Sequence, residues 1–269
     1  MQLMLFQIIL LFIPIVLGLT YNIQNLFFSV INFWGDSTSL ELLISSYISN
    51  GRVVSLICGV LISLIIYKGI VSFNAQRYFN KGNKYLTYGY WFYWIAANIF
   101  RFEKISLVNL PIYMQYLLVI NETFPVLEAD QSFISEESSI KEIEVEIKKI
   151  MEVDSGKQLN LVLIDTYEIN QNELPLTKIG LPTIILKSVN QVDGNRTTNP
   201  EFIKKVRENT NYYSRKFKRI NIFSTTNTNH TKAIAKQCFQ NSGRTGFKEV
   251  VVYQADNKDY KFKNSYKII

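Results

Sequence analysis

Residues 4–20 read Met-Leu-Phe-Gln-Ile-Ile-Leu-Leu-Phe-Ile-Pro-Ile-Val-Leu-Gly-Leu-Thr and contain no charged side chain. A helix needs about 20 mainly apolar residues to cross a hydrocarbon core of about 30 Å, so this run is at the short end of what spans a bilayer. A cleaved signal peptide would show a basic start and a small-residue cleavage site, and neither is visible in residues 1–22. The sequence favours a retained membrane helix, which Pro14 would kink.

A second apolar run covers residues 53–73 and is interrupted only by Lys68, whose amine can extend toward the lipid headgroups. Residues 21–51, between the two runs, contain no Lys or Arg. Three basic residues follow the second run closely: Arg77, Lys81 and Lys84. By the positive-inside rule, the segment between the runs faces out and both termini face the cytoplasm. We expect an integral protein of the inner or plasma membrane, with the lipid bilayer as a partner.

A third hydrophobic stretch, residues 85–100, holds eight aromatic side chains and has basic residues on both flanks. Tyr and Trp favour the headgroup level of a membrane, so we interpret the stretch as an interfacial or re-entrant helix rather than a third span. Residues 105–120 are also hydrophobic but are broken by Pro111, and they should pack on their neighbours. Residues 1–120 are therefore assigned to a membrane domain, whose helices could also form a homo-oligomer.

Residues 121–138 contain five acidic side chains and no basic one, which is typical of a linker. An amphipathic helix is predicted after it, over residues 139–153, because four isoleucines recur at helical spacing. They are Ile140, Ile143, Ile147 and Ile150. We expect this helix to pack on the domain that follows; a coiled-coil dimer seam is the alternative, although only two heptads are present.

From residue 159 onward, short apolar runs alternate with helical patterns. Strands are predicted at 159–165, 183–188, 219–223 and 247–253, with a final edge strand after the turn at 256–259. One helix should begin at Asn199, with Pro200 in its first position, and another should run from Asn229 to Gly243. This succession predicts a cytoplasmic α/β domain over residues 139–269, Rossmann-like in architecture, with a mostly parallel sheet.

Polar residues follow the three inner strands, where ligands of open α/β sheets gather. Asp165 ends the first strand, Lys187 lies at the end of the second, and residues 224–226 end the third. The third run continues directly into a helix start, where backbone N–H groups attract an anion. The candidate ligand-binding residues are Asp165, Lys187, Thr225, Thr226, Asn229, His230, Thr231 and Lys232. The alternative is ordinary turn and cap chemistry, because no Gly-rich phosphate-binding signature accompanies them.

Positive charge is concentrated in residues 196–248, which carry twelve basic side chains and two acidic ones. Such a field attracts anionic partners: a nucleotide, a nucleic acid backbone or the anionic inner leaflet. A cluster at the end of a predicted helix is the candidate anion or lipid patch: Arg215, Lys216, Lys218 and Arg219. Part of this cluster can be structural, since cations also stabilise a helix C-terminus. Tyr212 or Tyr213 could stack on a base, while the other packs into the core.

Catalytic signals are sparse. The chain has one histidine, which excludes a two-histidine metal site, and a serine triad would have to be built on His230. Cys58 falls in the second apolar run and Cys238 in a predicted cytoplasmic helix, and both are interpreted as small apolar residues. We therefore assign no catalytic residue, metal or cofactor.

Three functions fit these features. In the first, the α/β domain binds an anionic ligand, such as a nucleotide, and signals to the membrane helices. In architecture the chain is similar to the two-span effectors of bacterial nucleotide-signalling defence systems, which implies such a role. The second is a scaffold that docks a protein partner or anionic lipid through its basic domain, and the third is a membrane-anchored enzyme that acts on a phosphorylated substrate with Asp165 as base or metal ligand.

Overall fold

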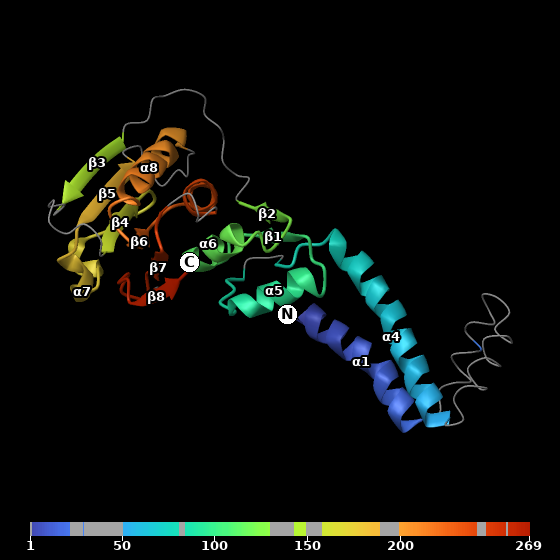
Figure 1. Ribbon diagram of the computed structural model, residues 1–269. Coiled ribbons are helices and arrows are strands. Elements are labelled where there is room, and N and C mark those ends of the chain that lie inside the picture. The colour runs from blue at the N-terminus through green and yellow to red at the C-terminus, as the bar shows by residue number, and fades with distance from the viewer. Residues whose placement is uncertain are drawn as a thin grey trace. The chain divides into compact units, whose positions relative to one another are not determined.

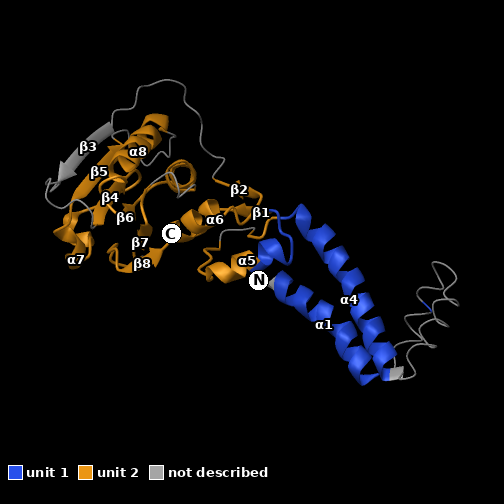
Figure 2. Cartoon of the chain, in the orientation of Figure 1, with its two compact units in different colours: residues 1–77, 95–103 blue, residues 78–94, 104–269 orange. Residues whose placement is uncertain are grey.

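The computed structural model describes residues 2–21, 29, 51–80, 84–129, 143–148, 158–188, 199–240, 246–256 and 258–269, with only the backbone of 143–148 (Figure 1). The chain forms two compact units (Figure 2). The first comprises residues 1–77 and 95–103, and the second comprises residues 78–94 and 104–269. Residues 104–128, which were predicted to belong to the membrane domain and the linker, lie in the same unit as the α/β sheet.

The first unit is built on two long helices, α1 (Gln2–Thr20) and α4 (Gly51–Ala75), which pack along each other. Within the described residues, these are the two helices long and apolar enough to cross a membrane. Their outward side chains are large and apolar: Phe6 is 60% exposed and Ile65 is 65% exposed. They coincide with the two apolar runs from which spans were predicted. Most of the intervening segment, 21–51, lies outside the described residues.

Small side chains let α1 and α4 approach closely in this hairpin, between residues 11–18 of α1 and residues 55–63 of α4. A Cβ placed on Gly18 would lie 2.7 Å from the Ser55 carbonyl oxygen, and one on Gly59 would meet the carbonyl of Pro14. Ser63 Oγ donates to the Leu11 carbonyl at 2.8 Å, which adds a polar contact between the helices. Small residues with interhelical hydrogen bonds are the usual basis of helix packing in lipid.

A buried amide pair joins the two helices near one end of the hairpin. Gln7 Nε2 donates to Asn74 Oδ1 at 2.8 Å, and Asn74 Nδ2 donates to Gln7 Oε1 at 3.1 Å. Asn74 Nδ2 also donates to the Phe100 carbonyl at 2.9 Å. The amides thus satisfy each other, as polar groups among apolar neighbours must.

The third hydrophobic stretch forms a helix much shorter than predicted. Helix α5 (Tyr90–Asn98) has nine residues instead of the sixteen expected from 85–100. At 1.5 Å per residue it is about 13.5 Å long, which is too short to cross the hydrocarbon core alone. Tyr93 is buried, whereas Trp91 and Trp94 are exposed.

The second unit contains a six-stranded sheet in the order β3-β5-β4-β6-β7-β8. The strands are β3 (Ile143–Lys148), β4 (Gln158–Ile164), β5 (Thr183–Ser188), β6 (Arg219–Ser224), β7 (Glu249–Gln254) and β8 (Asn264–Lys267). The four central strands are parallel, while β3 and β8 pair antiparallel at the edges. The α/β sheet with a mainly parallel centre agrees with the prediction.

Helices cover one face of this sheet. They are α6 (Ile112–Ile120), α8 (Pro200–Tyr213) and α9 (Thr228–Ile234), which continues as a π-helical turn, η3 (Ala235–Phe239). The other face carries a core of Val162, Ile164, Phe223, Val251, Tyr253 and Phe262. Leu174, between η2 (Gln171–Glu173) and α7 (Leu176–Ile179), packs against that core. Because side chains alternate along a strand, Leu161 and Leu163 face the helices instead.

Two local predictions were wrong. Residues 143–148, predicted as part of a helix over 139–153, form strand β3 beside β5. The same segment alternates Ile143, Val145 and Ile147 with charged residues, and this period of two with β-branched side chains suits a strand. Within the predicted linker, β2 (Val126–Glu128) pairs in parallel with β1 (Lys104–Ser106). The remainder of that linker from residue 130 lies outside the described residues.

The close packing of α1 on α4 leads to a first prediction. Gly18→Ala places a methyl group against the backbone of α4, whereas Gly69→Ala in the same hairpin meets nothing within 4 Å. Overpacking costs about 1–3 kcal/mol. We expect Gly18→Ala to speed maleimide labelling of the buried Cys58 by about tenfold, the equivalent of about 1.4 kcal/mol, with the full chain in detergent. Equal labelling rates in the two variants would contradict the packing.

Candidate functional site

The strand order places the topological switch point of the sheet at the carboxyl ends of β4 and β6, an edge that we call the strand-end crevice. Strand β5 lies on one side of β4 and β6 on the other, so the chain leaves β4 in one direction and returns past it to β6. The first crossover contains η2 and α7, and the second contains α8. In open α/β sheets, ligands bind where two such crossovers diverge. Asp165 and residues 224–226 follow the two strands at this point.

Asp165 is almost fully buried there, with 6% of its surface exposed. One of its carboxylate oxygens, Oδ2, accepts three hydrogen bonds: from Asn227 N at 2.9 Å, Asn227 Nδ2 at 2.8 Å and His230 Nδ1 at 2.8 Å. A buried carboxylate needs such donors, because desolvation otherwise disfavours its charged form. Asp165 is thus surrounded by the first turn of α9.

The hydrogen bond at the second ring nitrogen of His230 indicates which tautomer the ring adopts. Asn199 N donates to His230 Nε2 at 2.8 Å. Since a backbone N–H is only a donor, Nε2 accepts and the ring proton lies on Nδ1, facing Asp165. The imidazole, which is fully buried, therefore connects the carboxylate after β4 with the start of α8.

Both helix caps belong to the same network. Asn199 Oδ1 accepts from Phe202 N at 3.1 Å, as an N-cap does, and Asn199 Nδ2 donates to Ser188 Oγ at 3.0 Å. Asn227 Oδ1 accepts from His230 N at 2.9 Å and caps α9. The predicted cap at Asn199 is confirmed. The helix start predicted at Asn229 was wrong by two residues, because Asn227 reaches the third residue of the helix while also serving Asp165; the end predicted at Gly243 lies outside the described residues.

Hydroxyl groups extend this hydrogen-bond network from the end of β6 to α9. Thr226 Oγ1 lies 2.6 Å from Ser224 Oγ and 2.7 Å from Thr231 Oγ1. Thr231 Oγ1 also donates to the Asn227 carbonyl at 3.0 Å. All of these side chains are buried. The fold therefore gathers four predicted ligand residues, Asp165, Thr226, His230 and Thr231, but they hydrogen-bond with one another and their neighbours in the interior.

Two further predicted residues, Lys187 and Thr225, lie at the same edge but on the other face of the sheet. Strand alternation places them with Ile185 and Phe223, away from α8 and α9. Thr225 Oγ1 donates to the Tyr167 carbonyl at 2.7 Å, and Lys187 Nζ lies 2.6 Å from Glu168 Oε1. The side chains of Lys187 and Glu168 are both partly exposed. Lys187, Thr225, Tyr167 and Glu168 thus lie at the exposed strand ends, whereas Asn229 is half-buried on α9, which covers the opposite face.

The side chain of Lys232 lies away from the strand ends. Its ammonium donates to the Leu127 carbonyl at 2.6 Å and lines a separate pocket of about 410 Å³. The half turn between His230 and Lys232 places the two side chains on different sides of α9. Lys232 is therefore not part of the strand-end crevice.

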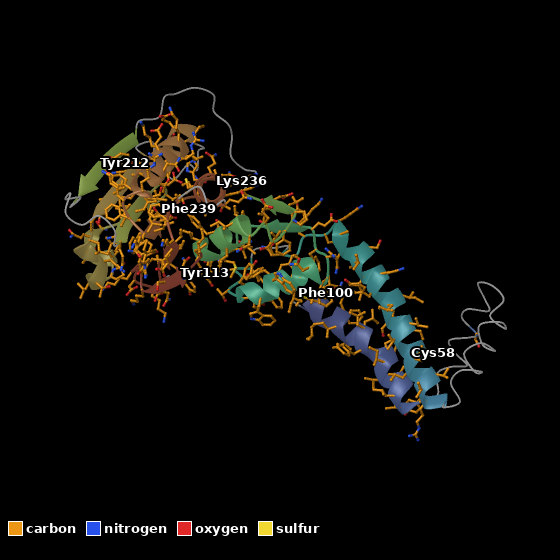
Figure 3. The ribbon with its side chains drawn as sticks, viewed as in Figure 1. Cys58, Phe100, Tyr113, Tyr212, Lys236 and Phe239 are labelled. Carbon is orange, nitrogen blue, oxygen red and sulfur yellow. The ribbon has the colours of Figure 1, made fainter. Side chains whose placement is uncertain are left out.

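The basic patch lies at the opposite end of the sheet. Arg219 opens β6, and Thr225 follows its last residue, so about 20 Å of extended strand separates them. Arg219 Nη1 lies 3.4 Å from Glu249 Oε2, and Lys216 Nζ lies 4.5 Å above the ring of Tyr212. Arg215 and Lys218 are exposed nearby. The patch and the crevice do not converge. Tyr212, which is labelled in Figure 3, is exposed, whereas Tyr213 is buried.

The other potential nucleophiles and metal ligands of the described residues do not form a cluster. Within the described ranges, no three His, Cys, Asp or Glu side chains are placed to hold a metal ion. Cys58 and Cys238 are both free and buried. Burial raises the pKa of the Cys238 thiol to about 12, so the thiolate is scarce at neutral pH.

The predicted set of ligand-binding residues did not include Asn227, Tyr167, Glu168 or Ser188. Asn227 had a usable signal, because it stands three residues before His230 in a run of cap-forming residues. Tyr167 and Glu168 follow Asp165 without a recognisable pattern. Their role at the edge depends on the path of the loop after β4.

The buried network generates a second prediction. Asp165→Asn replaces an ionic acceptor of three hydrogen bonds and brings an amide donor against other donors. We expect a cost of about 2 kcal/mol and a melting temperature lower by roughly 5 °C, measured by labelling of the buried Cys238 during heating of the full chain. Glu168→Gln, at the exposed edge, serves as the control and should melt like the parent. Asp165→Asn melting with the control would show that the network is dispensable.

Comparisons with solved structures identify the SAVED/CARF-domain containing receptor Cap4 of Acinetobacter baumannii as similar to this chain. With the cyclic trinucleotide 3'3'3'-cAAA, that structure has 11% identity and a TM-score of 0.45, and covers 64% of this chain and 40% of the receptor. With 2'3'3'-cAAA, the identity is 11%, the TM-score 0.44 and the coverage 66% and 41%. The match thus spans about two fifths of the receptor chains. No curated protein matches the sequence.

A protein family matches over the full length. Its description is SUa-2TM, the SMODS- and Ubiquitin system-associated 2TM effector domain, and it matches residues 1–269. The two apolar helices α1 and α4, followed by an α/β sheet, fit that description. The chain belongs to the family of SMODS- and Ubiquitin system-associated 2TM effector domains.

Proposed function

We propose that this chain is a membrane effector whose α/β unit binds an anionic ligand of the nucleotide type at the carboxyl ends of β4 and β6. Binding would change the packing or the oligomeric state of the two apolar helices. One combination of features supports this proposal. A chain of a 2TM effector family contains two apolar helices long enough to span a membrane, together with an α/β sheet. The two crossovers of that sheet diverge at a point where hydroxyl, amide and ammonium groups lie.

The exposed groups of the crevice suit such a ligand. Lys187 offers an ammonium to a phosphate, and Tyr167, which is 71% exposed, offers a ring on which a base can stack. The buried Asp165 and His230 act as positioning residues, because they hold the starts of α8 and α9 against the strand ends. A ligand that prefers one arrangement of these helix starts would shift the equilibrium between two states.

An enzymatic role for Asp165 is not favoured by its surroundings. A general base must reach the proton that it removes, and a metal ligand needs partner ligands. Asp165 is almost fully buried and accepts three hydrogen bonds on one oxygen. We therefore propose that Asp165 holds the strand-end crevice in shape and does not react with a substrate.

We also propose that the α/β unit lies on the cytoplasmic side. Arg52 stands at one end of α4, whereas Arg77, Lys81 and Lys84 follow the other end, and the side richer in basic residues faces the cytoplasm. We expect trypsin added to inside-out membrane vesicles to cleave the α/β unit at exposed basic residues such as Arg215 and Lys218, and trypsin added to right-side-out vesicles to leave that unit intact. The reverse pattern would overturn the orientation without affecting the ligand proposal.

The ion pair at the crevice supplies a matched test of ligand binding. Lys187→Gln and Glu168→Gln break the same exposed contact, so each should change stability by less than about 1 kcal/mol. We expect Lys187→Gln to weaken binding about tenfold, since a hydrogen bond to a charged group contributes about 1.5–3 kcal/mol. Glu168→Gln should leave affinity equal or higher, because a competing carboxylate is removed.

Binding is measured by calorimetry on the full chain in lipid nanodiscs. The probes are mononucleotides, linear dinucleotides and cyclic oligonucleotides, including the 3'3'3'-cAAA seen in the Cap4 receptor structure. Binding of no probe to the parent chain, or equal losses in the two variants, would count against the strand-end site. Equal losses would indicate that only the ion pair matters.

A further inference from the structure

The pocket that contains Lys232 is separate from the strand ends and is enclosed by elements far apart in the sequence. Its walls come from the end of α6, the segment leading into β2, and the helical segment α9–η3. The lining residues are Val119, Glu122, Phe124, Pro125, Leu127, Lys232, Lys236 and Gln240. The volume of about 410 Å³ lies within the range of small-molecule sites.

Two lysines line this pocket from neighbouring turns of one helical segment. Lys232 and Lys236 are four residues apart, which places them on the same side, and like charges at this spacing repel. Lys232 Nζ is held by the Leu127 carbonyl, which satisfies one of its three N–H groups. Burial, followed by the charge of Lys236, lowers the pKa of the Lys232 ammonium, against an opposing effect of Glu128.

The nearby carboxylates are engaged by neutral partners. Gln240 Nε2 donates to Glu122 Oε1, and Tyr78 forms a hydrogen bond with Glu128 that raises the pKa of the phenol. Among the described residues, no carboxylate comes within 4.0 Å of either Lys232 or Lys236. The fold thus keeps two positive charges together, at an energetic cost, and none of the described carboxylates forms an ion pair with them.

We propose that this pocket binds a phosphate group carried by a molecule with an apolar portion. The phosphate would lie between Lys232 and Lys236, where two point charges replace its counterions, while the side-chain amide of Gln240 lies on the same wall. The apolar portion would contact Phe124 and Pro125 on the other wall. This site does not depend on the ligand proposed for the strand ends, because it shares no residue with that crevice.

Two sources supply this chemistry: the headgroup of an anionic phospholipid and a soluble phosphate compound. The experiment compares them on the full chain in nanodiscs, by trace acetylation of amines and mass spectrometry of the Lys232 peptide. One arm adds inorganic pyrophosphate to phosphatidylcholine discs. The other uses discs with one third phosphatidylglycerol and no pyrophosphate. We expect acetylation of Lys232 to slow at least fivefold in one arm, which identifies the source, while Lys204 on α8 changes in neither.

Variants separate a built site from general charge attraction. Lys236→Gln should abolish the protection of Lys232, because the second point charge is lost from the pocket. Lys258→Gln removes another exposed positive charge, which belongs neither to this pocket nor to the basic patch, and should leave protection intact. Absence of protection in both arms, or protection that survives Lys236→Gln, would overturn the proposal. Melting temperatures of both variants, followed through Cys238, show whether each one remains folded.

Discussion

The carboxylate of Asp165 is the group around which the α/β unit is arranged. It enters the helix-covered side of the sheet at the end of a buried strand, and a charge in that place is stable only with donors around it. The chain supplies those donors from the start of α9. The His230 ring, which donates to Asp165, also accepts a hydrogen bond from the backbone N–H of Asn199 and so fixes the start of α8. One charge therefore determines where two helices begin and how their caps are oriented.

This arrangement explains how much of the fold was predictable. The strands from β4 onward and the cap at Asn199 follow from dense aliphatic runs and from cap chemistry, both of which are local. Strand β3 was missed because isoleucines at 140, 143, 147 and 150 satisfy a helical period, while 143, 145 and 147 satisfy a strand period as well. Pairing with β5 decided between the two periods, and a single sequence does not contain that information.

The candidate site was predictable in its location but not in its exposure. The ends of the strands can be found from the sequence, and most of the chosen residues do lie there. Which of them meet solvent depends on the face that each side chain takes: Asp165 and Thr226 turn inward, whereas Lys187 and Thr225 take the other face. Lys232 shows a further limit, because its partner is a carbonyl more than a hundred residues away.

The amide pair in the hairpin limits how this protein can move. Gln7 and Asn74 match each other only at one register of α1 against α4, and the glycine contacts at 18 and 59 require the same register. Sliding one helix along the other by a single turn would leave two amides unpaired among apolar neighbours. It would also bring larger side chains to the places where only glycine fits against the facing backbone. A piston-like displacement is therefore expensive, and any signal that reaches the hairpin is expected to tilt or regroup it as a rigid body.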